Sequence, residues 1–147
     1  RDALEPEAME NLSFKEAVDR VTQQDERYAP EAYFFVRDGL EHTTKNLRKG
    51  ARGLARHVNG KELSEGLCNY ALDEFGPLAY YTLKRWGITR TDDFGEIVFA
   101  LIAAGMLGKT DEDKREDFDH LFDLYETLGR IYEVAPDPPP SARRRRP

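Results

Sequence analysis

Apolar residues recur every three or four positions along most of the chain, the spacing of helices with one buried face. The clearest stripe consists of Phe94, Ile97, Val98, Leu101 and Ile102, at i, i+3, i+4, i+7 and i+8. No stretch alternates between apolar and polar residues over the length of a strand. The pattern therefore predicts an all-α protein, a compact single domain of about six short helices.

Several local signals mark where these helices begin and end. Predicted helix starts are Ser13 with Glu16, Pro30, Asn59 with Glu62, and Thr91 before two aspartates, because these residue types satisfy or tolerate the free N–H groups of a first turn. Gly76-Pro77 separates two helices, and Gly87 is placed as a C-terminal cap. A last helix is predicted to open at Thr110, with the apolar face Phe118, Leu121, Phe122, Tyr125, Leu128 and Tyr132.

The chain divides into three parts by composition. Residues 1–12 are predicted to be a loose acidic leader, and residues 13–134 the helical domain. Residues 135–147 contain repeated prolines and a run of four arginines, which predicts a disordered tail. At 147 residues, the chain has the length of one domain. Whether further residues precede Arg1 stays open.

The charge and the length of the apolar runs indicate the class of protein: a globular chain without a membrane-spanning segment. The formal net charge is −6, there is one cysteine, and the longest apolar run, residues 97–104, is too short to cross a bilayer. No signal-peptide pattern opens the sequence, so a cytoplasmic protein without a membrane contact is predicted. Oligomeric state is not predicted.

One segment is strongly basic although the chain is acidic. Residues 45–57 contain no acid, and five cations are spaced so that a helix would align them in one stripe: Lys45, Arg48, Lys49, Arg52 and Arg56. Such a stripe is one way in which proteins contact phosphate backbones or acidic partners. Gly50 and Gly53 interrupt it, so the segment is either a frayed helix or a loop.

Motifs that would carry chemistry are incomplete. Asp-Phe-Gly at residues 93–95 is a kinase signature, but the phosphate loop, strand lysine and second lobe of a kinase are missing. The acidic run from Asp111 fails as a calcium loop, since Glu116 stands where glycine is needed. The histidines have no metal-ligand spacing, and Cys68 is predicted to be a buried, inert thiol. No catalytic residue, cofactor or metal is therefore predicted.

A cluster of polar residues leaves two interpretations open. Asp25, Arg27, Tyr28, His57 and Glu62 could converge in a pocket, or they could cap helices and hold turns. The second interpretation is preferred, because helix ends must satisfy their free backbone groups.

Five stretches together resemble a small family of uncharacterised bacterial proteins. They are QQDERYAPEAYFFV, HVNGKELSEGL, FGPLAYYTLKRWGI, DDFGEIVFALI and KREDFDHLFDLYE. The family is best represented in planctomycetes and verrucomicrobia, and the resemblance covers about residues 13–132. It implies a bacterial, cytoplasmic origin. No activity is assigned to the family, so the resemblance transfers no functional residue.

The sequence favours a non-enzymatic helical module that binds another protein. Tyr80, Tyr81 and Phe99 are the predicted contact residues, because they are large and lie off the main apolar stripes. The alternative is a factor that binds RNA, DNA or the ribosome through the 45–56 stripe and the arginine tail. An enzyme of unknown reaction is the third possibility, which would require a pocket with convergent polar groups.

Overall fold

The fold is all-α, as the hydrophobic spacing predicted. It was analysed in a computed structural model that describes residues 6–50, 58–109 and 112–133; within these ranges there is no strand. The five α-helices are α1 (Pro6–Gln24), α2 (Pro30–Gly50), α3 (Gly60–Phe75), α4 (Ala79–Arg85) and α5 (Thr91–Ala103). Shorter helical turns are η1 (Gly76–Leu78), η2 (Arg115–Phe118), η3 (Tyr125–Gly129) and η4 (Arg130–Tyr132).

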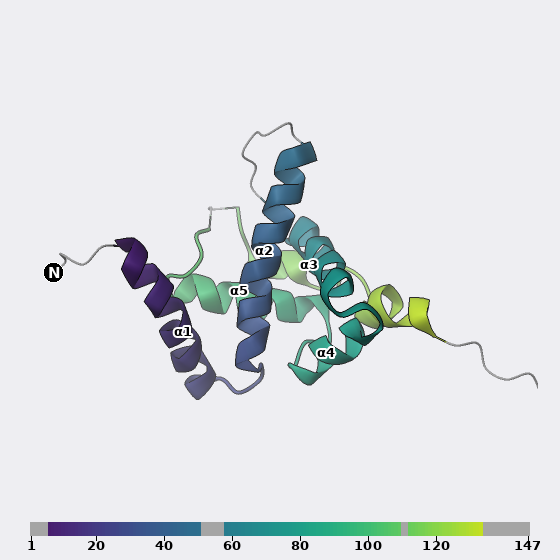
Figure 1. Cartoon of the computed structure of the whole chain (residues 1–147), viewed down its shortest axis with the longest axis horizontal. Helices are drawn as coiled ribbons and strands as arrows, with labels where there is room; N and C mark the ends of the chain where they lie inside the picture. The colour runs from purple at the N-terminus through teal and green to yellow at the C-terminus, as the bar shows by residue number, and fades with distance from the viewer. Residues whose placement is uncertain (1–5, 51–57, 110–111, 134–147) are drawn as a thin grey trace, which may run out of the picture.

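The long helix α2 runs through the middle of the molecule (Figure 1). It contacts α1, α3 and α5, while α4 packs beside α3. Helix α1 lies at one end of the long axis, and α4 lies towards the other end with the last helical turns (Figure 1). Fully buried side chains at the centre include Tyr33, Val36, Leu67, Phe94, Ile97 and Leu101.

Two glycines allow α2 and α3 to pack closely. A Cβ on Gly39 would lie 2.3 Å from a methyl carbon of Leu67, and one on Gly66 would lie 2.0 Å from the Thr43 hydroxyl oxygen. Real side-chain atoms do not approach so closely, so larger residues at either position would push the helices apart. The buried Thr43 hydroxyl instead donates to the carbonyl of Gly39, at 2.7 Å.

Most predicted helix boundaries are confirmed. Helix α2 begins at Pro30, and the capping box of α3 is formed, with Asn59 accepting from the Glu62 N–H and Glu62 accepting from the Asn59 N–H. Gly87 has a φ of 98° after α4, a conformation that glycine adopts without a Cβ penalty. The predicted start at Ser13 is wrong, because α1 already begins at Pro6. Residues 6–12 of the predicted leader are therefore helical.

The predicted continuous last helix is wrong, because this segment is divided into short helical turns. Residues 115–133 fold into η2, a link, η3 and η4 rather than into one α-helix. His120 in the link has a φ of 50°, which no α-helix contains. The apolar residues of the predicted face are divided between these pieces, and Phe118, Leu124 and Leu128 are buried.

Two further glycines bring η2 onto the helical core. A Cβ on Gly60 would lie 2.9 Å from the carbonyl oxygen of Asp117, and a Cβ on Gly95 would lie 2.9 Å from side-chain carbons of Phe118. The lack of a side chain at Gly60, the first residue of α3, and at Gly95, the fifth residue of α5, thus leaves room for η2. Packing against these two helix starts takes the place of a continuous last helix.

Candidate functional site

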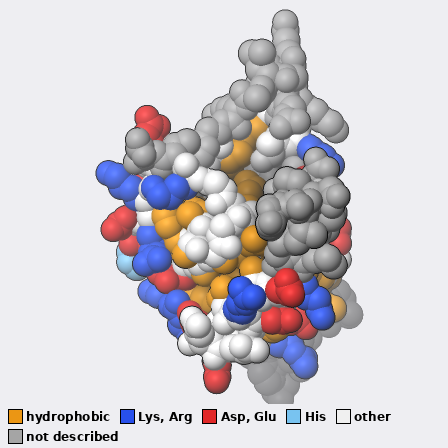
Figure 2. Space-filling model, turned by 90° about the vertical axis from the view of Figure 1, so that its left-hand side faces the viewer, with side chains coloured by type: hydrophobic (Ala, Val, Ile, Leu, Met, Phe, Trp, Pro, Cys, Tyr) orange, Lys and Arg blue, Asp and Glu red, His pale blue; other side chains and the backbone are white. Residues whose placement is uncertain are grey.

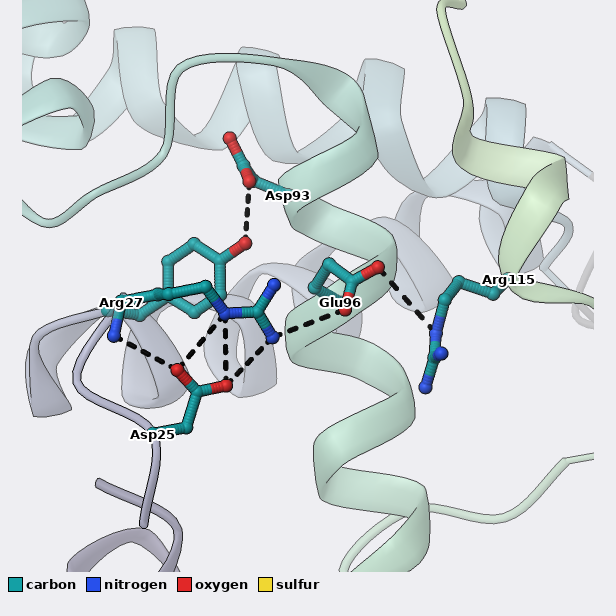
Figure 3. A network of polar contacts seen from close by, with 6 residues as sticks. Asp25, Arg27, Asp93, Glu96 and Arg115 are labelled. Carbon is teal, nitrogen blue, oxygen red and sulfur yellow. Dashed lines mark hydrogen bonds and ion pairs between the residues drawn. The ribbon is translucent and has the colours of Figure 1, made fainter. Parts of the chain in front are cut away.

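A chain of charged side chains connects the turn after α1 to α5 and η2 (Figure 3). The Arg27 guanidinium lies 2.7 Å from a carboxylate oxygen of Asp25 and 3.3 Å from Glu96. Glu96 in turn lies 3.8 Å from Nε of Arg115. Hydrogen bonds from the Arg27 side chain and backbone lower the pKa of Asp25. Since the Arg27 side chain is 58% exposed, water screens these contacts and each contributes little to stability.

Beneath these charges lies a buried hydrogen bond between Tyr28 and Asp93. The Tyr28 hydroxyl donates to one carboxylate oxygen of Asp93 at 2.5 Å. The other oxygen accepts from the backbone N–H groups of Thr89 and Arg90, at 2.9 and 3.0 Å. Burial, together with the bond to Asp93, raises the pKa of Tyr28, so its hydroxyl stays protonated near neutral pH. Asp93 is therefore occupied in holding the turn before α5.

The start of α5 also holds the residues that follow η2. The Thr91 hydroxyl donates to the carbonyl of Phe118 at 2.8 Å and accepts from the N–H of Leu121 at 3.1 Å. Asp92 accepts from the N–H of His120 at 3.0 Å. Helix α5 begins at Thr91 as predicted, but Thr91 does not cap it: the N-cap residue is Arg90, and the Thr91 hydroxyl bonds the distant segment. The second interpretation of the polar residues is supported by the contacts of Asp25, Tyr28 and Glu62, which hold the turn after α1, the start of α5 and the start of α3.

An apolar pocket lies between α2, α3, α5 and η2. Its volume is about 220 Å³, and Leu40, Leu63, Val98, Phe99, Ile102 and Leu107 form much of its wall. Asp113, Lys114 and Asp117 also line it. The pocket is smaller than the cavities of roughly 300–1,000 Å³ that hold drug-sized ligands. Figure 2 shows apolar side chains, bordered by charged ones, on the face of the molecule that lies at the left of Figure 1.

A different surface carries the large apolar side chains that are most exposed in the described part of the chain. They are Leu78 at 65%, Tyr81 at 59%, Ile131 at 62% and Tyr132 at 43% exposure. Leu78 and Tyr81 belong to η1 and α4, while Ile131 and Tyr132 belong to η4. Both η1 and α4 contact η3, which leads directly into η4. We call these four residues, with Tyr80 and Tyr125, the tyrosine surface.

Aromatic contacts hold the two parts of the tyrosine surface together. The ring of Tyr80 lies 5.3 Å from that of Tyr81 and 5.0 Å from that of Tyr125, both edge to face. The Tyr125 hydroxyl donates to the carboxylate of Glu133, and this bond raises the pKa of Tyr125 to about 12. The end of the described chain is thereby fixed beside α4.

The predicted contact residues do not all meet at one place. Tyr80 and Tyr81 lie in the tyrosine surface, but Phe99 lines the apolar pocket, and the guanidinium of Arg115 lies 5.6 Å from its ring. Leu78 is spaced in the sequence so as to share an apolar helix stripe with Ala79, Thr82, Leu83 and Trp86, and Tyr132 was predicted on the apolar face of the last helix; both side chains are exposed, so both placements are wrong. Ile131 was not predicted, although an apolar pair just before a proline-rich tail was visible in the sequence.

The basic stripe lies mostly outside the described side chains. The backbone is helical through Gly50, so Lys45, Arg48 and Lys49 share one helix. Lys45 lies 3.5 Å from Glu41. The side chains of Arg48 and Lys49, and the whole of Arg52 and Arg56, lie outside the described residues, as does the tail. Contact between the stripe and RNA, DNA or an acidic partner stays a prediction.

Among the described residues, no group of three or more His, Cys, Asp or Glu side chains could hold a metal ion. Cys68 is buried as predicted, and burial raises the pKa of its thiol to about 12. His57, which the sequence placed in the polar cluster with Asp25 and Glu62, lies outside the described residues. None of the described helices is both long and apolar enough to cross a membrane.

No family model, curated protein or solved structure gives a significant match to this chain. The resemblance to a bacterial family therefore stays a prediction.

Proposed function

We propose that the protein is a non-enzymatic interaction module that binds another protein through the tyrosine surface. The observation that carries this proposal is the gathering of exposed apolar side chains. Leu78 and Tyr81 belong to η1 and α4, which contact η3, and Ile131 and Tyr132 belong to η4, which directly follows η3 in the chain. Scattered apolar residues on a surface are ordinary, whereas a contiguous group is typical of an interaction site.

The chemistry of these side chains suits a protein contact. Tyrosine combines a large ring with a hydroxyl that can remain hydrated or bond a partner, and it is enriched among residues that dominate binding. Burying one large apolar side chain contributes roughly 1.5–3 kcal/mol. Burying the parts of these four side chains that are exposed would contribute favourably to a contact, and the cost of association is set against this gain.

Charges of both signs lie near the apolar side chains. Glu126 pairs with Arg130 at 2.8 Å, and Lys84 lies 6.0 Å from the Tyr80 ring. Mixed charges around an apolar centre resemble the polar rim of a protein interface. Such mixed charges favour a protein partner, with which they can form individual ion pairs. They do not favour RNA or DNA, which is attracted over long range by a surface of uniform positive charge.

Site-specific photo-cross-linking in the cell of origin tests the proposal. Benzoylphenylalanine would replace Tyr81 in one variant, Ile131 in a second and Asp19 in a third. Asp19 is exposed and lies on α1, at the other end of the molecule (Figure 1). The proposal predicts the same protein adduct from positions 81 and 131, and no such adduct from position 19.

A second substitution sharpens this experiment. Adding Leu78→Ser to the variant labelled at position 131 should reduce the adduct, because Leu78 belongs to the same surface. Failure of positions 81 and 131 to yield a common adduct, or an equal yield from position 19, would contradict the proposal.

A further inference from the structure

We propose that the tyrosine surface binds the proline-rich segment of its own chain, residues 136–140, as an intramolecular ligand. The segment reads Pro136, Asp137, Pro138, Pro139, Pro140. This inference rests on the proposed function, since it takes the same surface and names the chemistry that the surface recognises: an extended, proline-rich peptide.

The surface has the chemistry that proline-rich segments require. Such segments favour the polyproline II conformation, whose carbonyl groups are free and whose rings dock between aromatic side chains. The Tyr80 ring is inclined by 79° to that of Tyr81 and by 76° to that of Tyr125. The Tyr81 ring is 59% exposed, so it offers a flat face that can pack on a proline ring and a hydroxyl that can donate to a peptide carbonyl.

The position of the segment makes the contact possible within one chain. The described chain ends at Glu133, whose carboxylate accepts a hydrogen bond from Tyr125. Only Val134 and Ala135 separate it from the first proline. An extended chain spans at most about 3.6 Å per residue, so Pro136 stays within roughly 11 Å of Glu133. Since Tyr125 itself bonds Glu133 and lies against Tyr80, a link of two residues is long enough to let Pro136 reach these rings.

The short tether favours the chain's own segment over a second copy. A short flexible link gives an effective concentration in the millimolar range. A contact with a dissociation constant of about 1 mM would therefore be populated in roughly half of the molecules. Proline also lowers the cost of ordering the segment, because its φ angle is already fixed.

This arrangement makes the segment a competitor of the protein partner. A partner must displace the prolines, so its apparent affinity is reduced by the fraction of molecules in which the surface is covered. At half coverage, substitution of the prolines is expected to strengthen partner binding about twofold.

NMR on the purified full chain tests the inference without any partner. Spectra of the wild type would be compared with those of a variant carrying Pro136→Ser, Pro138→Ser, Pro139→Ser and Pro140→Ser. We expect shifts in the resonances of Leu78, Tyr80 and Tyr81, which are remote in sequence from the substitutions, and none in α1. In a Tyr81→Ser background, the same proline substitutions should shift Leu78 and Tyr80 much less.

Dilution and salt complete the test. An intramolecular contact gives shifts that do not change with protein concentration, and a contact with proline gives shifts that persist in high salt, where interactions of the arginine tail are screened. Unchanged resonances of Leu78, Tyr80 and Tyr81 would overturn the inference. Shifts that fade on dilution would mean that the tyrosine surface binds a second copy of the chain. Shifts that vanish in high salt would mean that they arise from the arginine tail. Either result also overturns the inference.

The failure of the proposed function and the failure of this inference can be distinguished, because different experiments test them. The NMR comparison needs only the purified chain, whereas the cross-linking experiment needs the cell. Adducts from positions 81 and 131 together with unchanged NMR spectra would leave the interaction module standing and remove the internal ligand.

Discussion

The two halves of residues 112–133 differ sharply in how their large apolar side chains are used. Phe118, in the first half, is 5% exposed, whereas Ile131, in the second, is 62% exposed. The first half lies on Gly60 and Gly95 and is bonded to Thr91 and Asp92. The second half is held through Tyr125 and Leu128 and then leaves the core. The first half is anchored by residues elsewhere in the chain, and where such anchors end, large apolar side chains remain exposed.

The largest effect is expected from Phe118→Ala. The ring is buried against the start of α5, and its loss leaves a cavity in addition to the lost burial of apolar surface. The free energy of unfolding should fall by about 3–5 kcal/mol. Urea denaturation measures this; a loss as small as that of Ile131→Ser would contradict the anchoring of the first half.

Thr91→Val should have an intermediate effect. Valine keeps the shape of threonine but removes the hydroxyl, which leaves the Phe118 carbonyl and the Leu121 N–H without this partner. The free energy of unfolding should fall by about 1–3 kcal/mol. Thr22→Val is the matched control, since the Thr22 hydroxyl only bonds carbonyls within its own helix. An equal loss in the two variants would argue against a specific role for Thr91.

Asp92→Asn should have a smaller effect that depends on pH. Partial burial acts to raise the pKa of Asp92, but backbone N–H groups, including that of His120, and the charges of His120 and Arg90 outweigh it and lower the pKa. A lowered pKa in the folded state stabilises the protein above the unfolded value of about 3.9, and this contribution is lost as the pH falls through the folded value. Near neutral pH, the free energy of unfolding of the wild type should exceed that of the variant by less than about 1 kcal/mol.

The pH series contains its own control. Asparagine retains an oxygen that can accept from the His120 N–H, so only the charge is removed. The difference between the two proteins should therefore disappear in acid. A difference that stays constant down to the lowest pH at which both remain folded would show that charge is not its cause.

Ile131→Ser should change stability least. The side chain is mostly exposed, and substitutions at such positions usually shift the free energy of unfolding by no more than about 0.5 kcal/mol. Thermal and urea denaturation check this. A loss of several kcal/mol would show that Ile131 belongs to the core and is not available to a partner.

Much of the fold could be predicted because its signals are local. Pro30 starts α2, the Asn59 capping box starts α3, and Gly87 follows the end of α4. The last segment could not be predicted, because its periodic apolar residues fit a helix equally well. Its actual path depends on the space left by Gly60 and Gly95 and on the distant hydroxyl of Thr91.

The candidate site was only partly predictable for the same reason. Tyr80 and Tyr81 stood out as large residues beside an apolar stripe, but exposure is a property of packing between segments. Leu78 fits a stripe and is nevertheless exposed, while Phe99 lies off its stripe and lines a pocket. Ile131 lies in η4, directly after η3, and the contact between η3 and α4 is a packing of distant segments that the local sequence does not reveal.

The most direct test of the account is the affinity for the partner captured from position 81. Binding of that purified protein would be measured by calorimetry with the wild type, Tyr81→Ser and the control Asp19→Ser. The account predicts at least about tenfold weaker binding for Tyr81→Ser, because truncating an aromatic hot-spot residue costs about 2 kcal/mol or more, and no change for Asp19→Ser. Equal affinities for all three proteins would contradict the claim that the tyrosine surface is the binding site.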